Sequence, residues 1–326
     1  MNRREFLKSS AIAAAAAALP VGLRKAAAQE DQRYYMVTFA SGIDYWKDCF
    51  RGMEDAAEFL GVNVEYTGSP ENDITAEVRV FEEVASQNPA GILATIINPD
   101  AFIEPINSAI DAGVPVVCFD ADSPLSKRYS FVGTGNYYAG VVAARYLGPL
   151  VGEGQVAISS VAAQLNHVQR RQGFIETLAA EFPNVTTSDD LIIDDQNNST
   201  MAAEKMSALL IANPDIKGIF ATDALGAVGV GQAVREAGLS GQVPIIGFDY
   251  DEGTLDLIDS GELGATLAQG TWQMGFWGLM MLYAVRNGLI QSVSDWQAAG
   301  ISPLPPNVDT GVVVITADNS QYWRAG

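Results

Sequence analysis

Histidine and cysteine are almost absent from this sequence. Its 326 residues include one histidine and two cysteines. Two cysteines are too few for a disulfide-stabilised scaffold or for a four-cysteine zinc site. A single histidine also argues against most histidine-based metal sites. The sequence therefore predicts no bound metal ion and no metal-dependent chemistry.

Basic residues are scarce as well. There are 19 lysines and arginines against 39 aspartates and glutamates, which leaves a net charge of −20. Such a chain is poorly suited to bind nucleic acid through its phosphates. Charged residues make up only 18% and hydrophobic residues 48%, so the chain is not of the disordered class. The length predicts two domains, each with a buried core.

The sequence also lacks the common motifs of nucleotide binding and nucleophilic catalysis. The first predicted strand is not followed by a Gly-x-Gly-x-x-Gly turn, and the glycine-rich stretch at 226–231 lacks the lysine of a phosphate loop. His167 has no recognisable nucleophile motif as a partner. Asp194 and Asp195 are adjacent at the junction of a strand and a loop. Neighbouring side chains of a strand point to opposite faces, so acid/base pairing is not implied. The sequence therefore predicts no enzyme and no cofactor.

Residues 1–28 have the composition of an export signal. A charged head at Arg3–Lys8 precedes the apolar run 11–23, which is too short for the ~20 residues of a membrane span. Three alanines at 26–28 supply a cleavage site. An alanine-rich helix is the alternative interpretation. Removing 1–28 takes away five basic residues and one acidic residue, and it moves the net charge from −20 to −24.

The charged head is similar to the twin-arginine export signal, with Asn2 in the position where serine is usual. This resemblance implies export in a folded state to the periplasm. The signal contains no cysteine, so a lipid anchor is not expected. Cys49 and Cys118 would then lie in an oxidising compartment and could form a bridge. Both lie in apolar stretches, and we favour two buried free thiols.

Beyond residue 33, short β-rich runs alternate with segments of helical period, such as Ile74–Ser86. This alternation predicts parallel sheets built from βαβ units, and continuous apolar runs such as Gly91–Ile97 suit strands covered on both faces. The predicted strands are Tyr35–Ala40, Asn63–Thr67, Gly91–Ile97, Pro115–Asp120, Tyr129–Thr134, Gln155–Val161, Leu191–Asp194, Gly218–Asp223, Val243–Asp249 and Ala265–Gln269. The apolar segment Trp272–Gly288 is predicted to be a core helix.

Two halves of the chain share a pattern. An Asn-Pro pair precedes Gly-Ile-Leu-Ala-Thr at 91–95, and another precedes Gly-Ile-Phe-Ala-Thr at 218–222. Each is followed at similar spacing by a Val-Pro strand that ends in aspartate, at Asp120 and Asp249. The sequence therefore predicts an α/β protein of two similar, doubly wound parallel-sheet lobes.

In such sheets a ligand lies outside the carboxyl ends of the strands, often between two lobes. The polar residues predicted at these ends are carboxylates or hydrogen-bonding groups. They are Asn98, Asp120, Thr134, Asp223, Asp249 and Gln269.

Several segments, in order, then give a family resemblance. They are Ile96–Pro99, Val114–Asp120, Arg170–Phe174, Gly247–Asp249 and Ala265–Gln269. Over roughly 33–320 the chain resembles the type I periplasmic binding proteins of ABC importers, in the branch of the ribose- and galactose-binding proteins. The resemblance implies lobes joined by a three-segment hinge, with lobe one at 33–134 plus 270–302 and lobe two at 135–269 plus 303–326. The proline-rich stretch Ser302–Pro306 suits the third hinge segment.

The resemblance also implies a ligand site and a mechanism of hinge closure around the ligand. Asp44, Tyr45 and Trp46 lie at a helix start where this family carries aromatic residues, and sugar C–H faces pack well on aromatic rings. Ordinary helix-start packing is the alternative for the two rings. The ligand-binding set that the resemblance implies adds Asn98, Asp120, Thr134, Asn136, Arg170, Asp223, Asp249 and Gln269.

Carboxylates and amides bind adjacent sugar hydroxyls, which both donate and accept hydrogen bonds. Asp120 and Asp249 could instead cap the following helices, and Arg170 could form a surface salt bridge. Ala121 stands where the ribose and galactose patterns often carry arginine, and Asp223 replaces an amide of the ribose branch. The run at 120–123 is closer to rhamnose- and autoinducer-2-binding members.

The expected ligand is thus a monosaccharide or polyol, with a deoxy-sugar or an amino-sugar left open. Autoinducer-2 or a nucleoside is the alternative. The expected partners are an ABC permease in the inner membrane and a chemoreceptor in a sensing role, and the protein is expected to be a monomer. A repressor of the LacI type shares the fold, but the export signal and the charge of −24 oppose it.

Overall fold

The computed structural model describes residues 32–324 except 72, 163 and 297. The predicted export signal at 1–28 lies outside the described residues. The chain divides into two compact units, which we describe separately. Unit 1 comprises the chain up to Val132 together with Thr271–Val308, and unit 2 comprises Gly133–Gly270 together with Asp309–Gly326. The chain therefore passes between the units at three points, and Ser302–Pro306 falls within unit 1 in this division.

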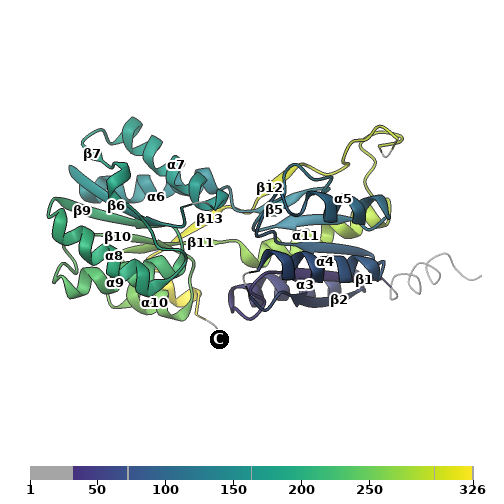
Figure 1. Ribbon diagram of the computed structural model, residues 1–326, viewed down its shortest axis with the longest axis horizontal. Coiled ribbons are helices and arrows are strands. Elements are labelled where there is room, and N and C mark those ends of the chain that lie inside the picture. The colour runs from purple at the N-terminus through teal and green to yellow at the C-terminus, as the bar shows by residue number, and fades with distance from the viewer. Residues whose placement is uncertain (1–31, 72, 163, 297, 325–326) are drawn as a thin grey trace, which may run out of the picture. The chain divides into compact units, whose positions relative to one another are not determined.

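Unit 1 is built on a six-stranded sheet with the order β12-β5-β4-β3-β1-β2 (Figure 1). The register of β1 against β2 and β3, of β3 against β4 and of β4 against β5 is parallel, as the βαβ pattern predicts. The strands are β1 (Arg33–Thr38), β2 (Asn63–Gly68), β3 (Gly91–Ala94), β4 (Val116–Phe119), β5 (Phe131–Gly133) and β12 (Asn307–Asp309).

Alternate residues of β1 point to opposite faces of this sheet, and both faces are covered. Tyr34 and Met36 pack with α3 and α11, whereas Tyr35 and Val37 pack with α4 and α5. This is why the strands of the sheet contain nearly continuous apolar residues. The helices are α3 (Tyr45–Leu60), α4 (Ile74–Ser86), α5 (Ile103–Asp111) and α11 (Thr271–Arg286).

Unit 2 repeats this design with a second sheet (Figure 1). The sheet has seven strands in the order β13-β11-β10-β9-β6-β7, and β8 pairs with β6. The strands are β6 (Gly154–Ser160), β7 (Val185–Thr186), β8 (Ile192–Asp194), β9 (Ile216–Ala221), β10 (Ile245–Phe248), β11 (Ala265–Gln269) and β13 (Val312–Ile315). The helices are α6 (Asn136–Val151), α7 (Leu165–Glu181), α8 (Ser199–Ala212), α9 (Ala224–Glu236) and α10 (Glu252–Asp259). Short 3₁₀ helices lie at Asp189–Leu191 and Ser320–Tyr322.

The same alternation holds the core of unit 2 together. Val156 and Ile158 of β6 pack on the side of α6 and α7, and Ala157 between them packs on the side of α8 and α9. The predicted parallel arrangement is confirmed for β6 and β8–β11. Strand β13 differs, because it pairs with β11 in antiparallel register. Its first residue lies opposite the last residue of β11, so the chain enters β13 at the end where β11 finishes and runs back along it.

Two further expectations concern single segments. Cys49 and Cys118 are both buried and free, as favoured above. They belong to different apolar clusters, on either side of the unit 1 sheet. The apolar helix α11 packs Met274, Leu279 and Leu282 into the core of unit 1. Within the described residues, no helix combines the length and apolarity needed to cross a bilayer.

Glu77 on α4 is a buried carboxyl in unit 1. Its Oε2 accepts a hydrogen bond from the Ile97 N–H at 3.3 Å, and its Oε1 has no partner among the described residues. Burial raises the pKa of Glu77 to about 8. The folded state therefore holds a proton that the unfolded chain releases above its ordinary pKa near 4.5.

We expect the free energy of unfolding to fall as the pH rises from about 4.5 to 8, because Glu77 is protonated in the folded state across that window. Glu77→Gln should remove roughly 3 kcal/mol of this loss between pH 5 and pH 7.5. Urea unfolding at a series of pH values measures it. The control is Glu82→Gln, at an exposed position of the same helix. Equal pH slopes in wild type and Glu77→Gln would show that Glu77 ionises normally.

Candidate functional site

The polar residues at the strand ends fall into two groups, one in each unit. We define rim 1 as the predicted site residues of unit 1 and rim 2 as those of unit 2. Rim 1 consists of Asp44, Tyr45, Trp46, Asn98 and Asp120. Rim 2 consists of Thr134, Asn136, Arg170, Asp223, Asp249 and Gln269.

In rim 1 the phenol of Tyr45 is held by a carboxylate. Tyr45, the first residue of α3, donates a hydrogen bond from its hydroxyl to Oδ1 of Asp120, at 2.7 Å. The bond spans from the start of α3 to the end of β4, and it fixes a half-buried aromatic ring beside an acidic acceptor. This is the combination that a hydroxylated ring needs, with an apolar face and a strong acceptor side by side.

Trp46 belongs to the core of unit 1. Its ring is only 1% exposed, and its indole N–H donates to the carbonyl oxygen of Phe39 at 2.9 Å. It makes edge-to-face contacts with Phe39, Tyr45 and Phe119. Because a fully buried ring is occupied by packing, these contacts favour helix-start packing over ligand stacking for Trp46. Trp46 instead supports the ring of Tyr45.

Two other residues of rim 1 have local partners. The side chain of Asp44 is 83% exposed and pairs with Lys47 at 2.7 Å, one turn along the helix. Such an exposed pair contributes little to stability or orientation. The Oδ1 of Asn98 accepts hydrogen bonds from the backbone N–H groups of Asp100 and Ala101, at 3.1 and 3.0 Å. Asn98 therefore shapes the loop after β3.

Sequence reasoning missed Arg128, which lies close to this group. Its guanidinium forms a largely buried ion pair with Asp122, and it also donates to the carbonyl oxygen of Pro306 at 2.8 Å and to Oδ1 of Asn307 at 3.1 Å. Asp122, part of the run compared with the rhamnose-binding members, is therefore committed to Arg128. The pair attaches the loop after β4 to the third segment that joins the units. No sequence signal linked residues so far apart.

Rim 2 is organised around Arg170, on the second turn of α7. The side chain is 3% exposed and its Cζ lies 3.7 Å from the centroid of the Phe248 ring. It donates to Oδ1 of Asn136 at 2.9 Å, to the carbonyl oxygen of Thr222 at 2.8 Å and to Oε1 of Gln269 at 3.0 Å. Burial excludes the surface salt bridge considered above. These bonds keep a desolvated positive charge fixed in direction at the strand ends.

Gln269, the last residue of β11, extends this network to two further predicted residues. Its Oε1 also accepts a hydrogen bond from the hydroxyl of Thr134 at 2.7 Å, and its Nε2 donates to Oδ1 of Asp249 at 2.8 Å. The structure thus brings five predicted residues into one continuous network in unit 2: Thr134, Asn136, Arg170, Asp249 and Gln269.

Asp120 and Asp249 occupy equivalent and unusual backbone positions. Each directly follows a buried strand, with φ of 60° at Asp120 and 67° at Asp249. Residues with a Cβ seldom adopt this left-handed conformation, and aspartate is among those that do. The capping alternative fails for Asp249, because Asp251 caps α10. It fails for Asp120 too, because its Oδ1 is bonded to Tyr45 and no helix begins beside it.

Asp223 has a different environment from the other residues of rim 2. Its Oδ1 accepts a hydrogen bond from the N–H of Gly226 at 2.8 Å, which makes it the N-cap of α9. Its Oδ2 is buried with no partner among the described residues. Burial and the neighbouring carboxylate of Asp195 raise the pKa of Asp223 to about 7. These contacts favour a structural role for Asp223, as the N-cap of α9, over direct contact with a ligand.

Asp195 and His167 are buried beside rim 2, and sequence reasoning set both aside. Asp195 accepts a hydrogen bond from the hydroxyl of Ser159 at 2.6 Å. His167 Nδ1 lies 2.8 Å from Oγ1 of Thr222. Burial, with Arg170 and Arg171 nearby, lowers the pKa of His167 well below its usual value, so the ring is neutral. Asp195 directly follows β8, and its carboxyl neighbour is Asp223, which is distant in sequence.

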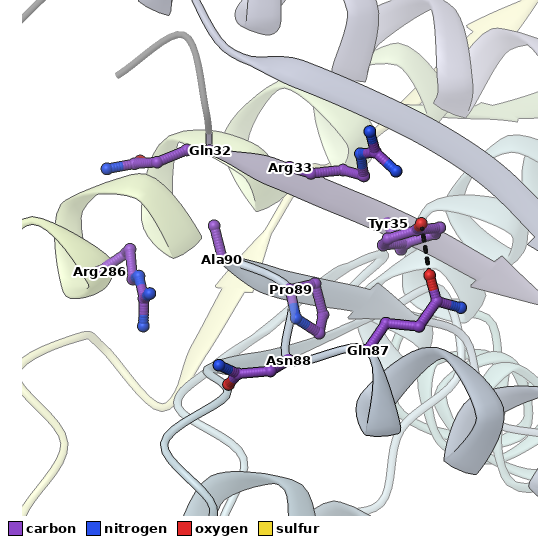
Figure 2. A pocket seen from close by; sticks show the side chains of 8 residues that line it. All are labelled: Gln32, Arg33, Tyr35, Gln87, Asn88, Pro89, Ala90 and Arg286. Atoms are coloured by element: carbon purple, nitrogen blue, oxygen red, sulfur yellow. Dashed lines mark hydrogen bonds between the residues drawn. The ribbon is translucent and has the colours of Figure 1, made fainter. Parts of the chain in front are cut away.

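We also searched the described residues for metal-ligand clusters and for pockets outside the two rims. Among the described residues, no group of three or more histidine, cysteine, aspartate or glutamate side chains could hold a metal ion. A pocket of about 450 Å³ in unit 1 lies at the amino ends of β1 and β3 (Figure 2). It contains Arg33 and Arg286, and the hydroxyl of Tyr35 donates to Gln87 there at 3.0 Å. It contains no residue of rim 1.

Comparisons with known proteins bear on the fold and on the export signal. A family model described as a periplasmic binding protein domain matches residues 34–289. A model of the twin-arginine translocation signal matches residues 1–20. The xylose/arabinose-binding protein XylF of Sulfolobus acidocaldarius is 28% identical over 290 residues, which are 83% of this chain and 68% of that protein.

Two solved structures are similar in both sequence and fold. A sugar-binding protein of a sugar ABC transporter from Bacillus halodurans is 45% identical, with a TM-score of 0.87 over 90% of this chain and 100% of that chain. The arabinose-binding protein AraP of Geobacillus stearothermophilus is 42% identical, with a TM-score of 0.83 over 90% of this chain and 100% of that chain.

Proposed function

Because the chain belongs to the periplasmic binding protein domain family, we propose that it captures a monosaccharide or sugar alcohol for an ABC importer. Its twin-arginine signal directs it to the periplasm, where such a protein meets its solute. Two similar structures are titled as sugar-binding and arabinose-binding proteins, and XylF is named for xylose and arabinose. A pentose such as arabinose is therefore the first ligand to test.

The observation that carries this proposal is the network of Arg170, Gln269 and Asp249. The guanidinium of Arg170 on α7 meets an amide and a carboxylate at the carboxyl ends of the adjacent strands β11 and β10, linked by hydrogen bonds of 2.8–3.0 Å. Together they offer donors and acceptors to neighbouring hydroxyl groups, which is the pattern that a sugar presents. Hydrogen bonds to charged groups contribute about 1.5–3 kcal/mol each when they are desolvated. Within unit 1, Tyr45 and Asp120 place an aromatic ring beside a carboxylate acceptor.

The ligand class is tested by calorimetric titration of the mature protein with arabinose, xylose, ribose and allose. Autoinducer-2 and nucleosides belong in the same panel. We propose that the protein binds without turnover, so recovered ligand should be chemically unchanged. Chemical conversion of the ligand by pure protein would contradict this. Three chain segments join the units, and we expect ligand binding to alter the radius of gyration through movement at this hinge.

Asp249→Ala should weaken binding of the preferred sugar by at least ~1.5 kcal/mol, about tenfold, because it removes a charge-assisted acceptor. Alanine is also strained at a φ of 67°. Asp249→Gly, which relieves that strain and still lacks the carboxylate, separates the two effects. Both variants should lose affinity, with Asp215→Ala at an exposed position of unit 2 as the control. Full affinity in Asp249→Gly would show that the carboxylate does not contact the sugar.

The delivery partner follows from the family and has its own test. We propose that the sugar-loaded, monomeric protein docks on an ABC permease of the inner membrane, and that a chemoreceptor can read the same loaded state. Stimulation of the ATPase activity of the reconstituted permease by loaded protein tests the first. Receptor pull-down with loaded and unloaded protein tests the second. No nucleic acid is expected as a partner, given the net charge of −20.

A further inference from the structure

Two carboxyl groups lie together inside unit 2, beneath rim 2. Asp195 is fully buried and Asp223 is 95% buried. Both approach Gly226 at the start of α9. A Cβ atom on Gly226 would lie 2.7 Å from Oδ2 of Asp195 and 3.1 Å from Oδ2 of Asp223. The two oxygens therefore converge on one small volume, from the end of β8 and from the end of β9.

The hydrogen bonds of the pair are complete except at this volume. Asp195 accepts from the Ser159 hydroxyl at 2.6 Å and from the Asn197 N–H at 2.9 Å, and Asp223 accepts from the Gly226 N–H at 2.8 Å. The Oδ2 of Asp223 has no donor among the described residues. Two carboxylate oxygens both accept, so they can bond to each other only when one carries a proton.

The charges around the pair do not remove the need for that proton. Arg170 on α7 favours the ionised form of Asp223, but its effect is smaller than those of burial and of the Asp195 carboxylate. Two further carboxylates oppose ionisation of the pair, because Asp249 raises the pKa of Asp223 and Asp194 raises the pKa of Asp195. Burial together with the two arginines keeps His167 neutral. The remaining charged groups nearby are Arg171, which interacts with Asp194, and Lys205 on α8, which donates to the backbone oxygen of Asp194.

The titration of both groups is displaced in the same direction. Burial is the main cause that raises the pKa of Asp223 to about 7 and also raises the pKa of Asp195. The charge of Asp195 adds to the shift at Asp223, whereas the hydrogen bond with Asp223 favours the ionised form of Asp195. Two buried carboxyls this close titrate as a unit, and one proton remains on the pair well above the usual range.

We propose that Asp195 and Asp223 hold one proton between them at neutral pH, and that this proton keeps rim 2 competent to bind its ligand. Asp195 is thus a positioning residue, which joins the end of β8 to the start of α9. Loss of the proton would place a second negative charge beside Arg170 and draw its guanidinium away from Gln269 and Asn136. The effect of the proton on ligand affinity rests on the proposed sugar-binding function, whereas the shared proton itself does not.

The proton itself is detected without any ligand. In a ¹³C NMR titration of aspartate side-chain carboxyls, wild type should show one carboxyl resonance that titrates near pH 7. That titration should disappear in Asp223→Asn, which keeps the N-cap, and should move toward the ordinary range of aspartate in Asp195→Asn. Asp215→Asn, at an exposed position of unit 2, should leave it unchanged. Titration of every aspartate below about pH 5 in wild type would overturn the proposal.

The link to binding is measured by calorimetry with arabinose at pH 6 and pH 8.5. Wild-type affinity should fall about 30-fold at the higher pH, as expected for a required proton with a pKa near 7. Asp223→Asn, which mimics the protonated acid, should bind equally at both pH values. An equal fall in wild type and Asp223→Asn would overturn the link. If arabinose binds at neither pH, the proposed ligand is wrong, and the NMR titration still decides whether the proton is present.

Discussion

Replacing Arg170 by methionine should lower the affinity for the sugar at least ~100-fold, about 3 kcal/mol. The guanidinium is the buried cation that holds rim 2 together, and it donates to Asn136, Thr222 and Gln269. Methionine keeps much of the packing on Phe248 and removes every one of these donors. Gln269 then loses the bond that orients its amide toward Asp249. Calorimetric titration with the sugar that binds the wild type best measures the loss.

The same variant should also be less stable, by about 1–3 kcal/mol, because three buried oxygen acceptors each lose a donor and, among the described residues, only that of Gln269 keeps another, from Thr134. Urea unfolding therefore accompanies the titration, so that loss of affinity is not confused with loss of fold. Arg170→Lys retains the charge without the planar fork, and it should recover only part of the affinity. Arg145→Met removes an exposed arginine that pairs with Glu181, and it should bind normally. Near-normal binding by a folded Arg170→Met protein would remove Arg170 from the site.

Replacing Gly140 by alanine should destabilise unit 2 by about 2–3 kcal/mol. Helices α6 and α7 cross at this glycine so closely that a Cβ would lie 2.0 Å from the backbone oxygen of Arg170. The two helices must separate, because the backbone oxygen of Arg170 cannot rotate away as the end of a side chain could. A favourable helix propensity of about 1 kcal/mol for alanine over glycine offsets only part of the cost. Separation would also move Arg170, so affinity should fall together with stability.

A matched control exists in the same unit. Gly231 lies inside α9, and its added Cβ would meet only the end of the Leu257 side chain, at 3.3 Å. Gly231→Ala should therefore be neutral or slightly stabilising. Comparing the two alanine variants by urea unfolding isolates the cost of the helix crossing from the general effect of glycine. Similar stabilities for the two would show that α6 and α7 can part without cost.

Much of the fold could be predicted from local sequence patterns, since strand and helix periods are properties of short segments. The helix over Ile74–Ser86 and the strand over Ala265–Gln269 have the predicted bounds. The antiparallel strand β13 was missed. Its direction is set by where the chain re-enters unit 2, and no periodicity encodes that. The same applies to β12, which is three residues long.

The sequence predicted well which polar residues lie at strand ends. It predicted less well those residues whose role depends on tertiary packing. The proximity of Gln269 and Asp249 could be predicted from their positions, because they lie at the carboxyl ends of neighbouring parallel strands. Trp46 and Tyr45 are adjacent on one helix, and only the packing around them separates a buried ring from an accessible one. Asp195 was missed because its neighbour Asp223 is distant in sequence. The burial that changes the chemistry of both is a property of the folded unit.

The left-handed backbone at Asp120 and Asp249 limits how the specificity of this protein can be redesigned. A library that randomises either codon would consist mostly of β-branched and bulky residues, which cost about 1–2 kcal/mol or more in that conformation. Aspartate, asparagine and glycine are the residues that tolerate it best. A sensor engineered from this scaffold would therefore gain new ligand preferences more readily at positions with ordinary backbone angles, with the two aspartates kept as fixed anchors.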